Sequence, residues 1–151
     1  MSVSARLAEL GIELPDVVPP LAAYVPAVRT GNLVYTAGQL PMESGSLLQA
    51  GKVGAEVTPE QGKALARVCA LNALAAAHSL VGIDSVARVV KVVGFVASAP
   101  GFNGQPGIIN GASQLFGEVF GEAGAHARSA VGVSELPLDA PVEVEVVFEV
   151  A

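Results

Sequence analysis

Arg128 and Glu143 are the residues of this chain best suited to chemistry on a small molecule. Arg128 stands in the apolar run 127–133, where a charged side chain is rarely buried unless it is paired. Its planar guanidinium matches a carboxylate through two parallel hydrogen bonds. Glu143 has the chemistry to hold a water molecule for attack on an electrophile. The structural alternative is an ion pair between Arg128 and Glu143 or Glu145, or a merely solvated Glu143.

The tyrosines and histidines are further candidates. Tyr24 and Tyr35 are the only tyrosines, and each would either donate a hydrogen bond or simply pack as a half-buried strand residue. Neither His78 nor His126 has a metal-ligating neighbour at a useful spacing, so no metal site is predicted. His126 stays a candidate because it precedes Arg128 by two residues, and such residues share one face of a strand.

Other catalytic classes find no support in the sequence. Cys69 lies on the apolar stripe of a predicted helix and is expected to be a buried small hydrophobe. A serine-histidine-acid triad lacks its nucleophile elbow. The glycine-rich segment 101–107 lacks the Gly-Lys-Ser/Thr ending of a phosphate-binding loop, so nucleotide binding is not supported. A single cysteine forms no intrachain disulfide, and a reducing cytoplasm is the expected location.

The helices and strands that would position these residues are predicted from the spacing of apolar residues and from the capping, glycine and proline residues at their ends. Thr58 as N-cap, Pro59 and Gln61 predict a helix start, and Gly82 predicts its end. Two β-rich runs around Thr30-Gly31-Asn32 predict a hairpin. The predicted elements are helices at 3–10, 58–80 and 108–121 and strands at 24–29, 33–37, 86–96, 127–133 and 142–150, with loops at 38–58 and 100–107.

This order of elements predicts an α+β domain, with two helices packed on one face of a mostly antiparallel sheet. Glu143 and Glu145 lie two residues apart in the last strand and therefore point to the same side of the sheet. That side must be solvated, paired or turned toward a site.

Composition limits the class of protein and its partners. The 151 residues are 52% hydrophobic and only 15% charged, with a mean hydropathy of +0.56, which excludes intrinsic disorder. So much apolar surface on one small domain predicts a homo-oligomer. A net charge of −6 argues against nucleic acid as the main partner. No apolar run is long enough to cross a membrane, and Met1–Leu10 has no signal-peptide character.

Several short motifs occur together in a characteristic order. They are Tyr24-Val25, Gly38-Gln39-Leu40-Pro41, Asn110, Arg128-Ser129-Ala130-Val131, Leu136-Pro137 and Val142-Glu143-Val144-Glu145. In these motifs the chain resembles the reactive intermediate deaminase family, also called the RidA or YjgF family. The resemblance covers roughly residues 20–150, with 1–20 as an N-terminal extension and 21–151 as the domain.

The resemblance implies a chorismate-mutase-like fold and a homotrimer whose sheets form the central core, with clefts between subunits. It implies hydrolysis of reactive enamines and imines, such as 2-aminoacrylate and 2-iminobutanoate, to 2-keto acids and ammonia, with no cofactor. Arg128 would clamp the carboxylate of the imine or keto acid, and Glu143 would hold the attacking water. Tyr24, Gly38 and Asn110 would line the cleft.

Departures from the family pattern indicate a less-characterised branch. Ala130, a further substrate-binding candidate, stands where many relatives have cysteine, and the segment 121–128 leads into the active-site strand with His126. Two other functions remain open at this point. One is a non-catalytic binding protein for small carboxylates, and the other is an endoribonuclease or translation inhibitor, a label often attached to relatives.

Overall fold

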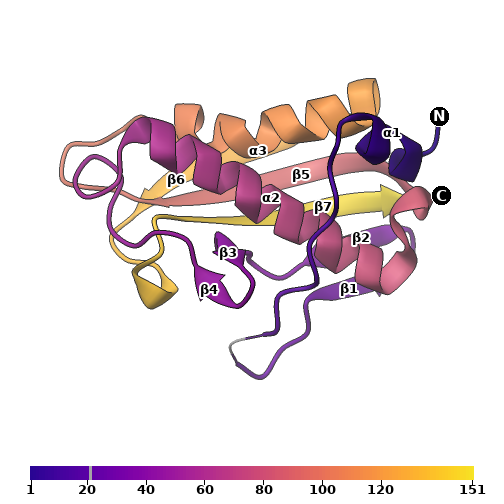
Figure 1. Ribbon diagram of the computed structural model, residues 1–151, viewed down its shortest axis with the longest axis horizontal. Helices are drawn as coiled ribbons and strands as arrows, with labels where there is room; N and C mark the ends of the chain where they lie inside the picture. Colours follow the sequence, from indigo (N-terminus) through magenta and orange to yellow (C-terminus); the bar gives the residue numbers. More distant parts are fainter. Residues whose placement is uncertain (21) are drawn as a thin grey trace.

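The computed structural model describes residues 1–20 and 22–151. Its main sheet has the strand order β1-β2-β7-β5-β6, and every neighbouring pair is antiparallel except β5 and β6 (Figure 1). The predicted α+β class and mostly antiparallel sheet are confirmed. The elements of the main sheet and its helices are α1 (Val3–Glu9), β1 (Ala27–Thr30), β2 (Leu33–Thr36), α2 (Pro59–Val81), β5 (Val86–Ala97), α3 (Gln105–Phe120), β6 (Ala127–Val133) and β7 (Val142–Val150).

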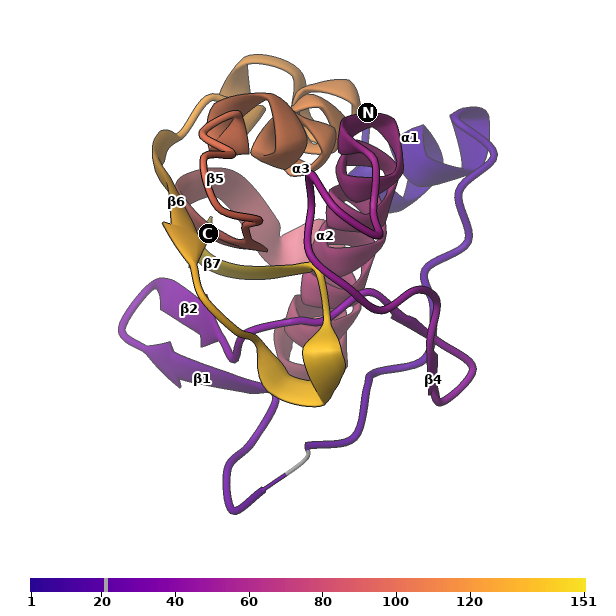
Figure 2. The ribbon, with the colours of Figure 1, turned by 90° about the vertical axis from the view of Figure 1, so that its left-hand side faces the viewer.

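Helices α2 and α3 lie side by side on one face of the sheet (Figure 2). Strand β7 has strict alternation of burial, and its buried set faces these helices: Val142, Val144, Val146, Phe148 and Val150. The alternate residues of β7 are half-buried on the other face of the sheet. The sheet therefore has one covered face and one open face, as the period of two requires.

Helix α2 begins with a capping box, because Thr58 Oγ1 accepts from the Gln61 amide and the Gln61 side chain accepts from the Thr58 amide. It ends at Val81, one residue beyond the predicted limit. By length and composition α2 could cross a membrane, but much of it is buried in the core of this domain.

Helix α3 starts at Gln105, three residues before its predicted start. Pro106 stands in the first helical turn, where its missing amide hydrogen costs nothing. The two helices approach closely at Gly111, where a Cβ atom would overlap the Lys63 carbonyl oxygen. Only glycine permits this close approach of the two helices. Helix α3 also contacts both β5 and β6.

The expected loop 38–58 contains a short hairpin, β3 (Met42–Glu43) and β4 (Ser46–Leu47). The preceding hairpin is shorter than predicted, because β1 begins at Ala27 rather than at Tyr24. Pro26 stands just before β1 and has no amide hydrogen for the ladder.

The N-terminal segment packs on the domain through α1. The Ser4 amide and hydroxyl each donate to the Asp84 carboxylate at 2.7 Å, and Arg6 Nε donates to the Glu118 carbonyl at 2.9 Å. These contacts lower the pKa of Asp84 through the two hydrogen bonds from Ser4. The predicted boundary after residue 20 falls at Leu21, outside the described residues.

Candidate functional site

Arg128 lies in β6 opposite Val92 of the parallel neighbour β5. Val92 is buried against the helices, so this register turns Arg128 toward α3. Arg128 Nη1 donates to Asn110 Oδ1 at 2.8 Å and to Ser113 Oγ at 3.2 Å, and Nη2 donates to the Pro106 carbonyl at 3.3 Å. The structure thus brings Arg128 and Asn110, two predicted site residues, into direct contact.

Three of the five guanidinium N–H groups are engaged by α3. The Nε–H and one hydrogen of Nη2 have no partner among the described residues. Two donors are the number that a bidentate contact with a carboxylate uses. The bonds to α3 also fix the plane of the guanidinium, which lowers the entropy cost of binding an anion.

The predicted structural alternative for Arg128, an ion pair with Glu143 or Glu145, is wrong. Within the described part of the chain, the ion pairs are Arg6–Glu9, Lys52–Glu135 and Arg67–Glu118. The register explains why. Glu143 pairs with Phe95, three positions along β5 from Val92, and therefore lies on the opposite face of the sheet from Arg128.

His126 shares the α3-facing side with Arg128, as the spacing predicted. Its Nε2 lies 2.9 Å from Ser113 Oγ, and its Nδ1 lies 2.6 Å from the Gly124 carbonyl. A carbonyl only accepts, so the neutral ring carries its proton on Nδ1 and accepts from the Ser113 hydroxyl. Ser113 thereby links the histidine to the arginine: it accepts from Arg128 and donates to His126.

A second group of predicted residues gathers at the start of β7. The Gln39 amide donates to the Val144 carbonyl at 2.8 Å, and the Val144 amide donates back at 3.0 Å. This bridge sets Gly38 beside Glu143, where a Cβ at position 38 would lie 2.6 Å from Glu143 Oε2. Because a Cβ at position 38 would displace the Glu143 carboxylate, glycine at this position lets that carboxylate keep its place.

Glu143 is partly removed from water. Burial raises the pKa of its carboxyl above the ordinary value, and the nearby charge of Glu145 raises it further. The two glutamates share the open face of the sheet, as predicted from their spacing. A carboxylate with a raised pKa is a stronger base toward a bound water molecule.

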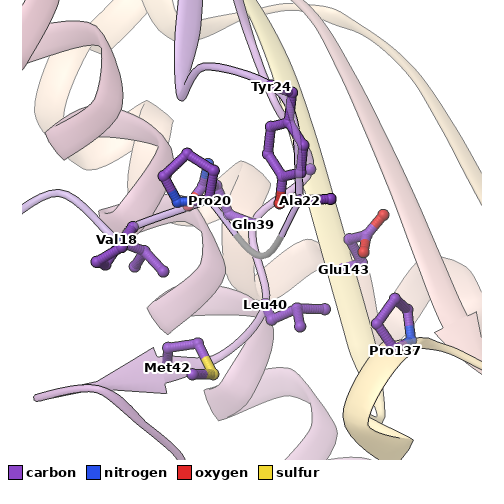
Figure 3. Close-up of a pocket in the computed structure, with 11 residues that line it drawn as sticks. Val18, Pro20, Ala22, Tyr24, Gln39, Leu40, Met42, Pro137 and Glu143 are labelled. Atoms are coloured by element: carbon purple, nitrogen blue, oxygen red, sulfur yellow. The ribbon is translucent and has the colours of Figure 1, made fainter.

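A cavity of about 210 Å³ opens beside Glu143. Figure 3 shows Val18 and Pro20 on one side and Glu143 and Pro137 on the other, with Leu40 between them. Tyr24, Gly38 and Glu143 also border a shallower hollow that extends over Val28 and Tyr35 on the open face. Glu143 therefore stands where a partly enclosed apolar cavity meets an open surface.

The predicted site residues thus form two groups within one chain. Arg128, Asn110 and His126 lie between β6 and α3, and Ala130 follows Arg128 on the same side of β6, packed against the core. Tyr24, Gly38 and Glu143 lie at the cavity. The sheet separates the two groups.

Two polar residues at these groups were not predicted. Ser113 stands three residues after Asn110, a spacing that puts both on one side of a helix. Asn72 is buried in α2, and its Nδ2 donates to the Leu40 carbonyl at 3.1 Å and to the Met42 carbonyl at 3.0 Å. In the sequence, the signal that could have identified these two residues is a polar side chain within an otherwise apolar predicted helix.

The remaining candidates have local roles. His78 Nδ1 accepts from the Ile83 amide at 3.0 Å and so closes the end of α2. Cys69 is fully buried as predicted, and burial raises the pKa of its thiol. In residues 1–20 and 22–151, no three His, Cys, Asp or Glu side chains converge as a metal site would require.

The sequence matches the family model described as Endoribonuclease L-PSP over residues 4–150. The chain belongs to this family, also called the RidA or YjgF family. The predicted family is thereby confirmed. Across this family, names that refer to endoribonucleases stand beside names that refer to deaminases.

Two relatives align over most of their length. Protein TCP17 of Trypanosoma cruzi is 44% identical over 149 residues, which are 97% of this chain and 93% of TCP17. The 2-iminobutanoate/2-iminopropanoate deaminase of Dermatophagoides farinae is 31% identical over 134 residues, 89% of this chain and 91% of that protein.

Solved structures of the family share the fold. The protein Atu1372 of Agrobacterium tumefaciens gives a TM-score of 0.90 at 44% identity, covering 99% of this chain and 92% of that one. The structure of E. coli TdcF with bound serine gives a TM-score of 0.62 at 26% identity, covering 91% and 93%. A family member thus binds a small amino acid.

Proposed function

We propose that this protein hydrolyses 2-imino acids and their enamine tautomers to 2-keto acids and ammonia, and that it acts in the cytoplasm. The observation that carries the proposal is the Arg128 guanidinium: α3 holds it, and two of its N–H donors have no partner in the described part of the chain and can bind a carboxylate. A 2-imino acid has a carboxylate beside its electrophilic carbon. The similarity to a 2-iminobutanoate/2-iminopropanoate deaminase supports this substrate class.

The active form in this proposal is a homotrimer with sites between subunits. Arg128 and Glu143 lie on opposite faces of one sheet, so a site that uses both needs two copies of the chain. The open face of the sheet carries apolar side chains suited to such an interface. Val28, Tyr35 and Val131 are 52%, 46% and 44% exposed there. In the proposed trimer, Arg128 of one subunit lies opposite Tyr24, Gly38 and Glu143 of the neighbouring subunit.

The reaction needs a positioned water and no cofactor. Glu143 accepts a proton from water while the water oxygen bonds to the imine carbon and the electron pair of the C=N bond moves to nitrogen. The proton then passes to that nitrogen and gives a carbinolamine. Glu143 next transfers the hydroxyl proton of the carbinolamine to the amino nitrogen, the C–N bond breaks with its electron pair leaving on ammonia, and the C=O bond of the keto acid forms. Arg128 holds the carboxylate throughout, so the protein supplies position and charge.

The test is a coupled assay with purified protein. An amino-acid oxidase generates 2-iminobutanoate, and semicarbazide traps what is not hydrolysed. Wild type is expected to suppress the trapped adduct, and Arg128→Ala is expected to lose that effect. The matched control is Arg67→Ala, which removes an exposed ion pair with Glu118 on the outer side of the helices. Equal suppression by wild type and Arg128→Ala would contradict the proposal.

A binding protein for small carboxylates would use the same two donors of Arg128. It would show thermal stabilisation by 2-keto acids without turnover. RNA is the rival substrate that the family description suggests. The acidic residues of the open face, Glu143, Glu145 and Glu149, and the net charge of −6 argue against it. RNA cleavage that survives purification and is lost in Arg128→Ala would support it.

A further inference from the structure

The cavity beside Glu143 has the composition of a receptor for an apolar group. Seven of its lining residues have apolar side chains: Val18, Pro19, Pro20, Ala22, Leu40, Met42 and Pro137. The others are Tyr24, Gly38, Gln39 and Glu143, so no lysine, arginine or histidine borders it among residues 1–20 and 22–151. The charged group that these residues place at its wall is negative.

Its volume is large for the side chain of 2-iminobutanoate. An apolar cavity of about 150 Å³ holds a benzene molecule. The cavity here measures about 210 Å³. It therefore has room for a branched aliphatic group or an aromatic ring, whereas an ethyl group would leave most of it empty.

Electrostatics fix the direction in which a 2-imino acid can enter. Its carboxylate is excluded from the cavity, because the charged group among the described lining residues is Glu143 and like charges in a partly buried site repel strongly. The open hollow on the other side of Glu143 is the remaining direction for the carboxylate. With the imine carbon next to the water held by Glu143, the side chain points into the cavity.

We propose that the preferred substrates are 2-imino acids with bulky apolar side chains, of the size of leucine or phenylalanine, seated in this cavity. The inference rests on the proposed deaminase function and adds the substrate class. Ala22 is the residue that tests it best. It lines the cavity with a small, solvent-exposed side chain, so enlarging it narrows the cavity without disturbing the core.

The experiment compares the imines of leucine, phenylalanine and 2-aminobutanoate in the oxidase-semicarbazide assay, at matched rates of imine production. Wild type is expected to have a kcat/KM for the bulky imines roughly tenfold or more above that for 2-iminobutanoate, the scale that hydrophobic pockets reach. Ala22→Leu is expected to lower kcat/KM for the bulky imines roughly tenfold or more and so to remove that preference. The matched control, Ala23→Leu, changes an exposed neighbour that does not line the cavity and is expected to preserve the preference.

The outcomes separate the two proposals. Hydrolysis of 2-iminobutanoate without preference for bulky imines, or an equal effect of Ala22→Leu on all three substrates, overturns the substrate class and leaves the deaminase function standing. Hydrolysis of none of the imines overturns both. Preference for the bulky imines that Ala22→Leu abolishes and Ala23→Leu retains supports the assignment.

Discussion

Asn72 ties the rim of the cavity to helix α2, and we expect Asn72→Ala to destabilise the protein by about 1–3 kcal/mol. Its amide donates to the carbonyls of Leu40 and Met42, and all of these atoms are removed from water. A typical hydrogen bond contributes about 0.5–1.5 kcal/mol to folding, and two are lost. The Leu40 carbonyl keeps a bond from the Met42 amide at 2.8 Å, which argues against a larger loss.

The assay is thermal unfolding at one fixed protein concentration, because oligomer stability depends on concentration. For a chain of this length each kcal/mol shifts Tm by about 2–4 °C, so a loss near 2 kcal/mol predicts a decrease of roughly 4–8 °C. Leu40 and Met42 both line the cavity, so we also expect a weaker preference for bulky imines.

The matched control is Ser79→Ala in the same helix. Ser79 is exposed and donates to the Ala76 carbonyl at 2.8 Å, and its removal is expected to change stability by less than about 0.5 kcal/mol. An Asn72→Ala variant that melts within about 2 °C of wild type would refute the reasoning that these two bonds hold the cavity rim.

Three further perturbations test the site. Glu143→Gln is expected to raise Tm near neutral pH and to abolish turnover. The raised folded-state pKa means that ionised Glu143 destabilises the fold. The gain in Tm therefore shrinks as pH falls and disappears below the ordinary glutamate pKa of about 4.3, where the wild-type carboxyl becomes protonated in both states; a gain independent of pH would contradict this. Gly38→Ala places a Cβ against Glu143 Oε2 and is expected to lower kcat by about tenfold to a hundredfold, whereas Gly117→Ala, with open space around its Cβ, leaves kcat unchanged in the same assay. Ser113→Ala removes one hydrogen bond that orients Arg128 and is expected to raise KM roughly five- to tenfold with little change in kcat; Ser113→Thr keeps the hydroxyl, and its failure to restore KM would argue against that role.

The sequence alone predicted the elements whose signals are local. The capping residues Thr58 and Gln61 placed the start of α2, and strand-like runs predicted strands at 127–133 and 142–150 with the bounds that β6 and β7 have. Alternation also put Glu143 and Glu145 on one side of their strand. Each of these signals lies within a few residues along the chain, so no distant contact was needed to read it.

Only the tertiary structure decided how those elements pair. The parallel register of β6 against β5 turns Arg128 toward α3, and the antiparallel register of β7 turns Glu143 to the other face. The bonds from Ser113 to Arg128 and from Asn72 to the cavity rim likewise join residues far apart in the sequence. The period of a strand tells which residues share a side, but which side meets the helices depends on the neighbouring strand and its register. The register that forms is the one that buries the apolar side chains of the whole sheet. In that register Arg128 and Glu143 of one chain lie on opposite faces.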